Sequence, residues 1–248
     1  MDYHTLEQEI VGWLQARLHK ASARGFVVGL SGGIDSATTA ALCTRAAPGQ
    51  VLGVWLPCHS ISEDEVYSRM AADALDIPLT TVDLCATYDA LVTSLPESDV
   101  RLASANLKPR LRMSALYYLA QANGYLVAGT GNRPELMVGF FTKWGDGGVD
   151  LEPLGELYKH EVRALARVLG VPQPIIDRAP SPGLWPGQTD EGEMGITYAE
   201  IDAILAAWDA GQEPDLPQAS IAKVEAMVAK SEHKRAMPPA FRVNRKGG

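Results

Sequence analysis

GFVVGLSGGIDS, residues 25–36, decides the fold of this chain. Its first six residues form a short apolar run bounded by glycine, which is typical of a buried parallel strand. The following segment, IDSATTAALCTRAA, predicts a helix that begins near Ile34 and ends before Pro48 and Gly49. Gly32 and Gly33 therefore lie in a tight turn between a strand and a helix.

The same alternation of strand and helix continues along the chain. Further strands are predicted at 51–56, 79–84 and 125–130, and a last one begins at Asp150 in DLEPLG. Helices are predicted at 3–19, from a Ser62/Glu65 capping box to about 75, at 104–122, at 158–169 before Gly170, from a Thr197/Glu200 capping box to 208, and at 219–230. This order predicts an α/β fold with a doubly wound parallel sheet and helices on both faces.

The predicted organisation is a single domain over residues 1–248. A nucleotide-binding core is expected at about 25–180, and a loop, helices and a basic tail at about 181–248. Charge alone favours a solvated tail. Ligands of such sheets bind outside the carboxyl ends of the strands, so the site is expected just after residues 30, 56, 84 and 130.

Composition narrows the classes of partner. The formal charge is −8, which disfavours general binding of nucleic acid. Three cysteines in no zinc-binding spacing indicate neither a metal site nor a disulfide framework. The start of the sequence lacks the features of a signal peptide, and no apolar run approaches the ~20 residues that span a bilayer. The expectation is a cytoplasmic protein without a membrane or nucleic-acid partner.

The turn Ser31–Ser36 admits three interpretations. It can be a plain strand-to-helix turn without a ligand. Gly29, Ser31 and Gly33 also fit the G-x-S-x-G elbow of serine hydrolases, although here the elbow follows the first strand and no HGGG-type segment is present. In the third interpretation the backbone N–H groups and the helix N-terminus cradle phosphate, the two serines donate hydrogen bonds, and Asp35 holds Mg²⁺.

Two familiar nucleotide motifs are absent. The chain lacks the G-x-x-x-x-G-K-[ST] P-loop. Gly129 and Gly131 begin a G-x-G-x-x-G pattern, but Pro134 occupies the place of its third glycine. The phosphate site is therefore neither a Walker-type nor a Rossmann dinucleotide site.

SGGIDS resembles the pyrophosphatase-loop signature of the adenine-nucleotide α-hydrolase superfamily. That resemblance implies a five-stranded parallel sheet, cleavage of ATP between its α- and β-phosphates, and adenylation of a substrate. Three further segments are similar to the ammonia-using NAD synthetases: NLKPRLRM (106–113), GTGNRPELMVGFFTKWGDGG (129–148) and EHKR (232–235) with Pro238 and Pro239. The resemblance extends over about residues 25–240.

The resemblance implies an amide-forming ligase that converts deamido-NAD (nicotinic acid adenine dinucleotide) into NAD. The nicotinate carboxylate would attack the α-phosphorus of ATP, and ammonia would attack the resulting acyl-adenylate, releasing AMP. The chain has no room for a glutaminase domain, so ammonia is free or comes from a separate glutaminase partner. Because NAD synthetases of this type are dimers, a homodimer is expected.

The resemblance also implies the site residues. It assigns ATP binding to Gly29, Leu30, Ser31, Gly32, Gly33, Ile34, Asp35 and Ser36, and to Thr130, Lys159 and Ser181. It assigns Mg²⁺ binding to Asp35 and Glu135, and contact with deamido-NAD to Arg110, Lys143, Asp150, His233 and Lys234. The expected catalytic residues are Asp35, Lys143, Asp150 and Lys159.

The residues themselves leave alternatives open. Arg110 and Arg112 suit bidentate contact with anionic oxygens, or are surface charges on a helix. Glu135 is a metal ligand or an ordinary first-turn helix charge. A nucleotide-binding sensor could keep SGGIDS without Glu135 and Lys143, and a GMP synthetase ATPase subunit should lack GFFTKWGDGG.

Overall fold

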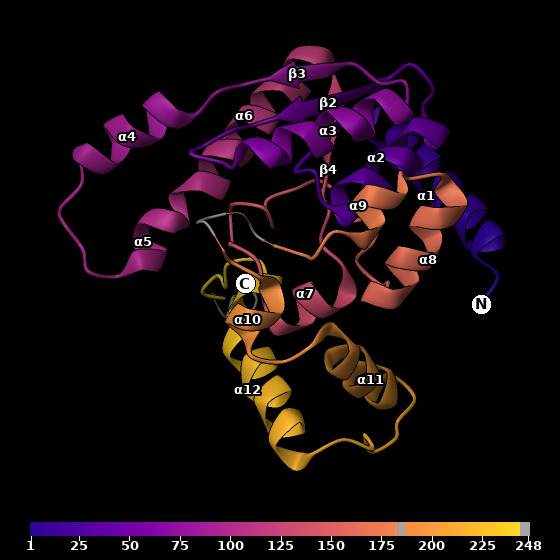
Figure 1. Ribbon diagram of the computed structural model, residues 1–248, viewed down its shortest axis with the longest axis vertical. Helices are drawn as coiled ribbons and strands as arrows, with labels where there is room; N and C mark the ends of the chain where they lie inside the picture. The colour runs from indigo at the N-terminus through magenta and orange to yellow at the C-terminus, as the bar shows by residue number, and fades with distance from the viewer. Residues whose placement is uncertain (182, 184–186, 244–248) are drawn as a thin grey trace, which may run out of the picture.

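A parallel four-stranded sheet forms the centre of the computed structural model, which describes residues 1–181, 183 and 187–243 (Figure 1). Its strands are β1 (Gly25–Gly29), β2 (Val51–Trp55), β3 (Leu79–Thr81) and β4 (Tyr125–Ala128). They lie in the order β3-β2-β1-β4, and every pair is parallel. The strand order reverses at β1, so the loop after β1 lies at the topological switch point where α/β sheets bind ligands.

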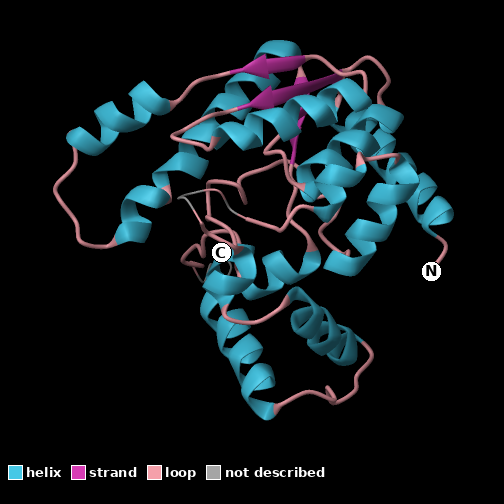
Figure 2. Ribbon diagram, viewed as in Figure 1, coloured by secondary structure: helices cyan, strands magenta, loops and turns pink. Residues whose placement is uncertain are grey.

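Helices make up most of the remaining chain (Figure 2). In chain order they are α1 (Tyr3–Ala21), α2 (Ile34–Ala46), α3 (Ser62–Ala74), α4 (Cys85–Thr93), α5 (Arg101–Ala105), α6 (Leu107–Asn123), α7 (Arg133–Val138), α8 (Lys159–Leu169), α9 (Gln173–Asp177), α10 (Asp190–Met194), α11 (Tyr198–Asp209) and α12 (Gln218–Arg235).

Alternate residues of β1 pack against helices on opposite faces of the sheet. Phe26 and Val28 lie in one apolar cluster with side chains of α1, α2 and α8. Val27 lies in another cluster, with Val54, Val127 and side chains of α6. Full burial on both faces explains why β1 is a continuous apolar run. The predicted α/β, doubly wound parallel architecture is therefore confirmed.

The predicted fifth strand is wrong for the residues that the structure describes. At Leu151 the chain makes an isolated parallel bridge to Ala128 and then leaves the sheet. Pro153 has no backbone N–H with which to extend a ladder. In addition, the side chain of Asp150 accepts a hydrogen bond from the backbone N–H of Val127 at 2.8 Å, so a carboxylate stands where a strand carbonyl would be.

Several predicted boundaries also differ. Ile61, not Ser62, is the N-cap of α3 and makes no side-chain capping bond, so the proposed Ser62 capping box is wrong. The predicted 104–122 helix is two helices, α5 and α6, and β3 ends at Thr81. The Thr197/Glu200 capping box and the left-handed Gly170 at the end of α8 are confirmed.

The C-terminal helices α11 and α12 have an apolar cluster of their own with Val138 of α7. The basic residues His233, Lys234 and Arg235 belong to the last turn of α12 rather than to a separate tail. The single-domain subdivision proposed from the sequence stays a prediction. Of the described helices, none has both the length and the apolarity needed to cross a bilayer. The three cysteines are free, as the sequence indicated.

Candidate active site

The loop after β1 is organised by its own serines. The backbone N–H of Ser31 donates to Ser36 Oγ at 3.2 Å, and Ser36 Oγ donates to the carbonyl of Gly33 at 2.9 Å. Gly32 has φ +80°, and a Cβ there would lie 2.8 Å from the carbonyl oxygen of Asp64. Glycine is therefore required at 32 by both conformation and space. The loop leads directly into the N-terminus of α2, whose backbone N–H groups favour an anion.

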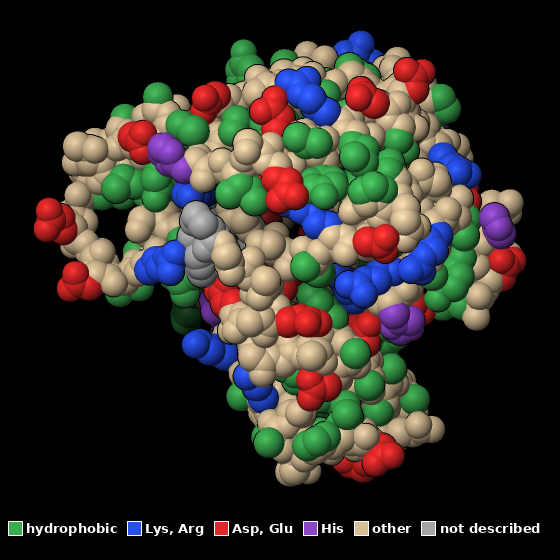
Figure 3. All heavy atoms as spheres, in the orientation of Figure 1, with side chains coloured by type: hydrophobic (Ala, Val, Ile, Leu, Met, Phe, Trp, Pro, Cys, Tyr) green, Lys and Arg blue, Asp and Glu red, His purple; other side chains and the backbone are tan. Residues whose placement is uncertain are grey.

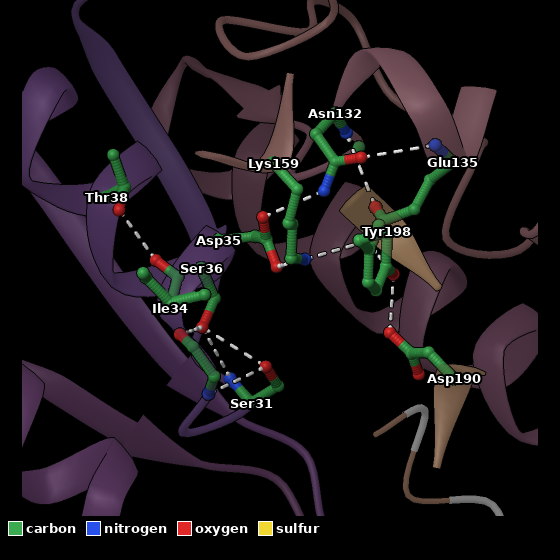
Figure 4. A network of polar contacts seen from close by, with 12 residues as sticks. Ser31, Ile34, Asp35, Ser36, Thr38, Asn132, Glu135, Lys159, Asp190 and Tyr198 are labelled. Carbon is green, nitrogen blue, oxygen red and sulfur yellow. Dashed lines mark hydrogen bonds and ion pairs between the residues drawn. The ribbon is translucent and has the colours of Figure 1, made fainter. Parts of the chain in front are cut away.

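A buried ammonium joins two carboxylates beside this loop (Figure 4). Lys159 Nζ lies 2.6 Å from Asp35 Oδ2 and 3.0 Å from Glu135 Oε1, and the lysine side chain is 2% exposed. The other Asp35 oxygen accepts a hydrogen bond from Asn132 Nδ2 at 2.9 Å. Burial alone would lower the pKa of Lys159, but Asp35 and Glu135 outweigh it and raise that pKa. The ammonium is therefore charged in this setting.

Tyr198 extends the cluster to a third carboxyl group. Its hydroxyl lies 2.8 Å from Glu135 Oε1 and 2.6 Å from Asp190 Oδ2. Burial raises the pKa of Glu135 and of Asp190, while Lys159 opposes both rises. Asp190 Oδ1 is buried and has no hydrogen-bond partner among the described residues. Two carboxylates thus contact the ammonium directly, and the third carboxyl group is joined to them through Tyr198.

Local sequence explains how these side chains are placed. Asn132 is the N-cap of α7 and forms a capping box with Glu135, which fixes Glu135 in the first turn. Lys159 is the first residue of α8, a position that the helix dipole disfavours for a cation. Asp202 of α11 offsets this cost, since its carboxylate accepts from the backbone N–H groups of Lys159 and His160 at 3.1 and 3.2 Å.

The loop and the carboxylates open into one cavity of about 720 Å³ at the carboxyl ends of the strands. Figure 3 shows a gap between the segment from α4 to α5 and the rest of the molecule, on a face where Lys and Arg side chains are scattered among acidic ones. The predicted ATP residues Thr130 and Ser181 line this cavity together with Asp35 and Glu135, whereas Lys159 lies behind the two carboxylates. The predicted ATP residues thus line one cavity, apart from Gly32 and Lys159.

The residues predicted to contact deamido-NAD lie mostly outside this cavity. Lys234 lines it and donates to the carbonyls of Gly139 and Phe141 at 2.7 Å. Lys234 also lines a second cavity of about 400 Å³ together with Asp150. Arg110 and His233 are exposed, and Lys143 Nζ contacts the carbonyls of His233 and Ala236. In the structure α12 therefore contacts the 139–143 segment. This contact could not be established from the sequence.

Four residues of the site were not singled out from the sequence: Asn132, Arg178, Asp190 and Tyr198. The N-x-x-E spacing of Asn132 and Glu135 is a capping signal that could have been used. Tyr198 and Asp190 reach the site from α11 and α10, far along the chain, and no local pattern indicates this. Arg112, left open as a surface charge, donates to the carbonyl of Leu56 at 2.9 Å and lines the cavity.

The donor set fits Mg²⁺. Asp35 and Glu135 present oxygen atoms to a single position, now held by an ammonium, and carboxylate oxygens are the ligands that Mg²⁺ prefers. Among the described residues no group of three or more acidic, His or Cys side chains is arranged around one metal position. A two-carboxylate site completed by phosphate oxygens and water is the usual arrangement for Mg²⁺ in nucleotide enzymes.

The serine-hydrolase interpretation finds no support. In the part of the chain that the structure describes, the hydrogen-bond partners of Ser31 Oγ are Ser36 Oγ and the backbone N–H of Gly33. A nucleophilic serine needs a base within hydrogen-bond reach. The loop is therefore organised to present N–H and hydroxyl groups rather than a nucleophile.

Glu152 supplies a test of the electrostatics around this site. Its Oε2 accepts from the backbone N–H of Gly131 at 3.0 Å, and burial raises its pKa to about 8, with Glu135 adding to the rise. The folded pKa lies above the unfolded value of 4.5, so this carboxyl destabilises the fold increasingly as pH rises from about 4.5 to 8. Glu152→Gln should therefore stabilise the protein at pH 8.5, by on the order of 1–2 kcal/mol, and change little near pH 4.5.

Thermal unfolding at both pH values measures this effect. Glu156→Gln is the matched control, because that side chain carries the same charge in the same segment and is 89% exposed. A gain for Glu152→Gln that is equal at both pH values would contradict the raised pKa.

Solved structures of NAD synthetases share this fold. A structure described as an NMN synthetase from Francisella tularensis has a TM-score of 0.90 and 36% identity, covering 98% of this chain and 99% of that one. An NH3-dependent NAD synthetase from Campylobacter jejuni, in complex with nitrate, has a TM-score of 0.85 and 28% identity, covering 98% and 100%. The fold and the pyrophosphatase loop thus define an ATP-using amide ligase of the NAD synthetase type.

Sequence comparison gives the family. The NAD synthase family model matches residues 6–238. An NH(3)-dependent NAD(+) synthetase from Carboxydothermus hydrogenoformans is 50% identical over 235 residues, covering 93% of this chain and 94% of that protein. One from Archaeoglobus fulgidus is 44% identical and covers 98% of each. The chain belongs to the NAD synthase family, and the resemblance first indicated by GFFTKWGDGG is confirmed.

Proposed function

We propose that this protein is an ammonia-dependent NAD synthetase, which amidates deamido-NAD to NAD with cleavage of ATP to AMP and pyrophosphate. The observation that carries the proposal is the placement of the SGGIDS loop, Asp35 and Glu135 around one cavity in a chain of this family. Relatives with that activity match nearly the whole chain at 40–50% identity.

The chemistry follows from the needs of amide formation. A carboxylate is a poor electrophile, and adenylation replaces its oxygen with a good leaving group. The nicotinate carboxylate attacks the α-phosphorus of ATP, and pyrophosphate leaves toward the loop. The hydroxyls of Ser31 and Ser36 and the backbone N–H groups at the start of α2 would bind phosphate oxygens, and for this the Ser36 hydroxyl has to turn away from the carbonyl of Gly33, to which it donates at 2.9 Å.

The cluster around Asp35 would neutralise the negative charge of the ATP phosphates. Asp35 and Glu135 would hold Mg²⁺, which supplies positive charge against the polyphosphate. Lys159, now paired with both carboxylates, would turn its ammonium toward the phosphates, and Thr130 and Ser181 would contact the rest of ATP. Ammonia then attacks the acyl carbon, and AMP leaves. Exclusion of water from the cavity prevents hydrolysis of the adenylate.

Arg110, Lys143, Asp150, His233 and Lys234 are proposed to bind deamido-NAD. Their places favour contact at the surface around α12 and the 139–150 segment rather than deep in the ATP cavity. Arg110 and His233 are exposed, and the homodimer expected from the family stays a prediction. Localisation in the cytoplasm and the source of ammonia, free or from a separate glutaminase, stay predictions.

A second candidate substrate is nicotinate mononucleotide. The structure with a TM-score of 0.90 is described as an NMN synthetase, and its 36% identity extends over almost the whole of both chains. The same adenylation and amidation would act on the smaller acceptor.

The deciding experiment is AMP release from ATP, Mg²⁺ and ammonium with one acceptor at a time: deamido-NAD, nicotinate mononucleotide or XMP. AMP formation with deamido-NAD, accompanied by NAD, is the expected result. A preference for the mononucleotide would assign the protein to NMN synthesis. AMP formed with XMP, or with none of the three, would overturn the proposal.

A further inference from the structure

Arg178, three residues before Ser181, reaches the pyrophosphatase loop from the segment after α9. One guanidinium nitrogen lies 3.4 Å from the carbonyl oxygen of Gly32, and another pairs with Asp64 Oδ1 of α3 at 2.5 Å. The guanidinium lies over the ring of Tyr67, 4.6 Å from its centroid. The side chain is 19% exposed and lines the 720 Å³ cavity. Three contacts thus hold one cation against the loop.

The position of Arg178 differs from those of the other cations at or near this cavity. Lys234 donates to the carbonyls of Gly139 and Phe141, and Arg112 to the carbonyl of Leu56. Lys159 is attached to the loop through Asp35 and stands among acidic side chains. Arg178 instead contacts the loop at Gly32, next to the N–H groups that begin α2. Any phosphate cradled there comes within reach of its guanidinium.

A structural role alone explains part of this geometry. The Arg178–Asp64 ion pair connects α3 to the segment that contains Ser181. However, Asp64 itself lines the cavity, and an ion pair between buried polar groups at a cavity wall adds little net stability. Stacking on Tyr67 fixes the plane of the guanidinium, which has five N–H groups in a fixed fork suited to bidentate contact with phosphate.

We propose that Arg178 is a pyrophosphate-binding residue, which contacts the β- and γ-phosphates of ATP and the pyrophosphate that leaves. The proposal rests on the proposed ATP-cleaving function. Asp64 and Tyr67 orient the guanidinium, and the positive charge it adds at Gly32 complements that of the Lys159 ammonium beside Asp35. The pyrophosphate is therefore held from two points of the loop while the α-phosphorus is attacked.

Calorimetric binding of pyrophosphate with Mg²⁺, without acceptor or ammonia, tests the proposal. Arg178→Gln should weaken this binding by about 10- to 100-fold, because a charge-assisted hydrogen bond is lost. Arg178→Lys should restore part of the affinity. Arg69→Gln is the matched control: it removes the same charge from α3, where Arg69 pairs with Glu65 near the surface. Its affinity for pyrophosphate should equal that of the wild type.

Asp64→Asn distinguishes pyrophosphate binding by Arg178 from a role of the Arg178–Asp64 pair in holding the Ser181 segment against α3. It also provides a test if Arg178→Gln does not fold. This variant removes the negative charge but keeps an oxygen that can accept from Arg178, so it should lose less pyrophosphate affinity than Arg178→Gln does. A purely structural role predicts equal losses in Asp64→Asn and Arg178→Gln, and that result would overturn the proposal. Wild-type affinity in Arg178→Gln would overturn it as well. Arg178-dependent pyrophosphate binding without amidation of any acceptor would refute the proposed function alone.

Discussion

Replacing Asp35 by Asn is expected to lower the rate of AMP formation about 1000-fold, because a loss of roughly 4 kcal/mol of transition-state stabilisation follows when the metal ligand is removed. Asn has nearly the shape of Asp and keeps an oxygen for the hydrogen bond from Asn132 Nδ2. Lys159 retains Glu135 as a partner at 3.0 Å, so the buried ammonium stays paired. The fold should therefore survive the change.

The measurement is single-turnover AMP release with saturating ATP, Mg²⁺, ammonium and deamido-NAD, together with thermal unfolding of each protein. Asp73→Asn, an exposed site on α3, is the control for loss of one carboxylate. Full AMP release by Asp35→Asn would refute the role of this carboxylate in metal binding. A large loss of stability in the same variant would point to a structural role for it instead.

Local sequence was sufficient to predict the elements that position the phosphate loop. The apolar run of β1 is explained by burial on both sheet faces, and the glycine at 32 by its left-handed φ. Asp35 and Glu135 were both proposed to bind Mg²⁺, and in space they share one ammonium. Their proximity follows from β1 and β4 being neighbours with a common carboxyl edge.

Interactions between distant segments were not predictable in the same way. Tyr198 and Asp202 lie on a C-terminal helix, and nothing in their own surroundings shows that one contacts Glu135 and the other supports the start of α8. The prediction of a fifth strand was wrong for a local reason, Pro153, and for a tertiary one, the hydrogen bond from the Val127 backbone N–H to the Asp150 side chain. His233, Lys234 and Arg235 were misjudged as part of a tail because charge does not show that Lys234 has carbonyl partners. Arg245 and Lys246 of the same predicted tail lie outside the described residues.

Lys159→Met should destabilise the protein by about 3–5 kcal/mol in the absence of divalent cations, since removing one partner of a buried ion pair leaves uncompensated charge. Asp35 Oδ2 and Glu135 Oε1 would then both face the space left by the ammonium. AMP formation should fall strongly as well, because the proposed phosphate contact is lost. The unpaired carboxylates should also change how strongly Mg²⁺ stabilises the fold, an effect that can be measured without activity.

If Asp35 and Glu135 hold Mg²⁺ as proposed, the Lys159 ammonium competes with the metal for the same two oxygens in the wild type. Without Lys159 the site should bind Mg²⁺ more tightly, and a ligand that binds only the folded state raises its stability by RT ln(1 + [L]/Kd). Millimolar Mg²⁺ without nucleotide should therefore increase the free energy of unfolding of Lys159→Met by more than that of the wild type. Urea unfolding in EDTA and in MgCl2 measures both gains.

Lys223→Met is the control for this comparison. Lys223 is exposed on α12 and donates to the carbonyl of Gly195, so it lacks a carboxylate partner in the candidate site. Its variant should respond to Mg²⁺ as the wild type does. An equal Mg²⁺ response in Lys159→Met and the wild type would mean that the ammonium does not occupy the metal position. Asp35 and Glu135 would then hold Lys159 alone, and the metal would have to be bound by the phosphates of ATP and other side chains.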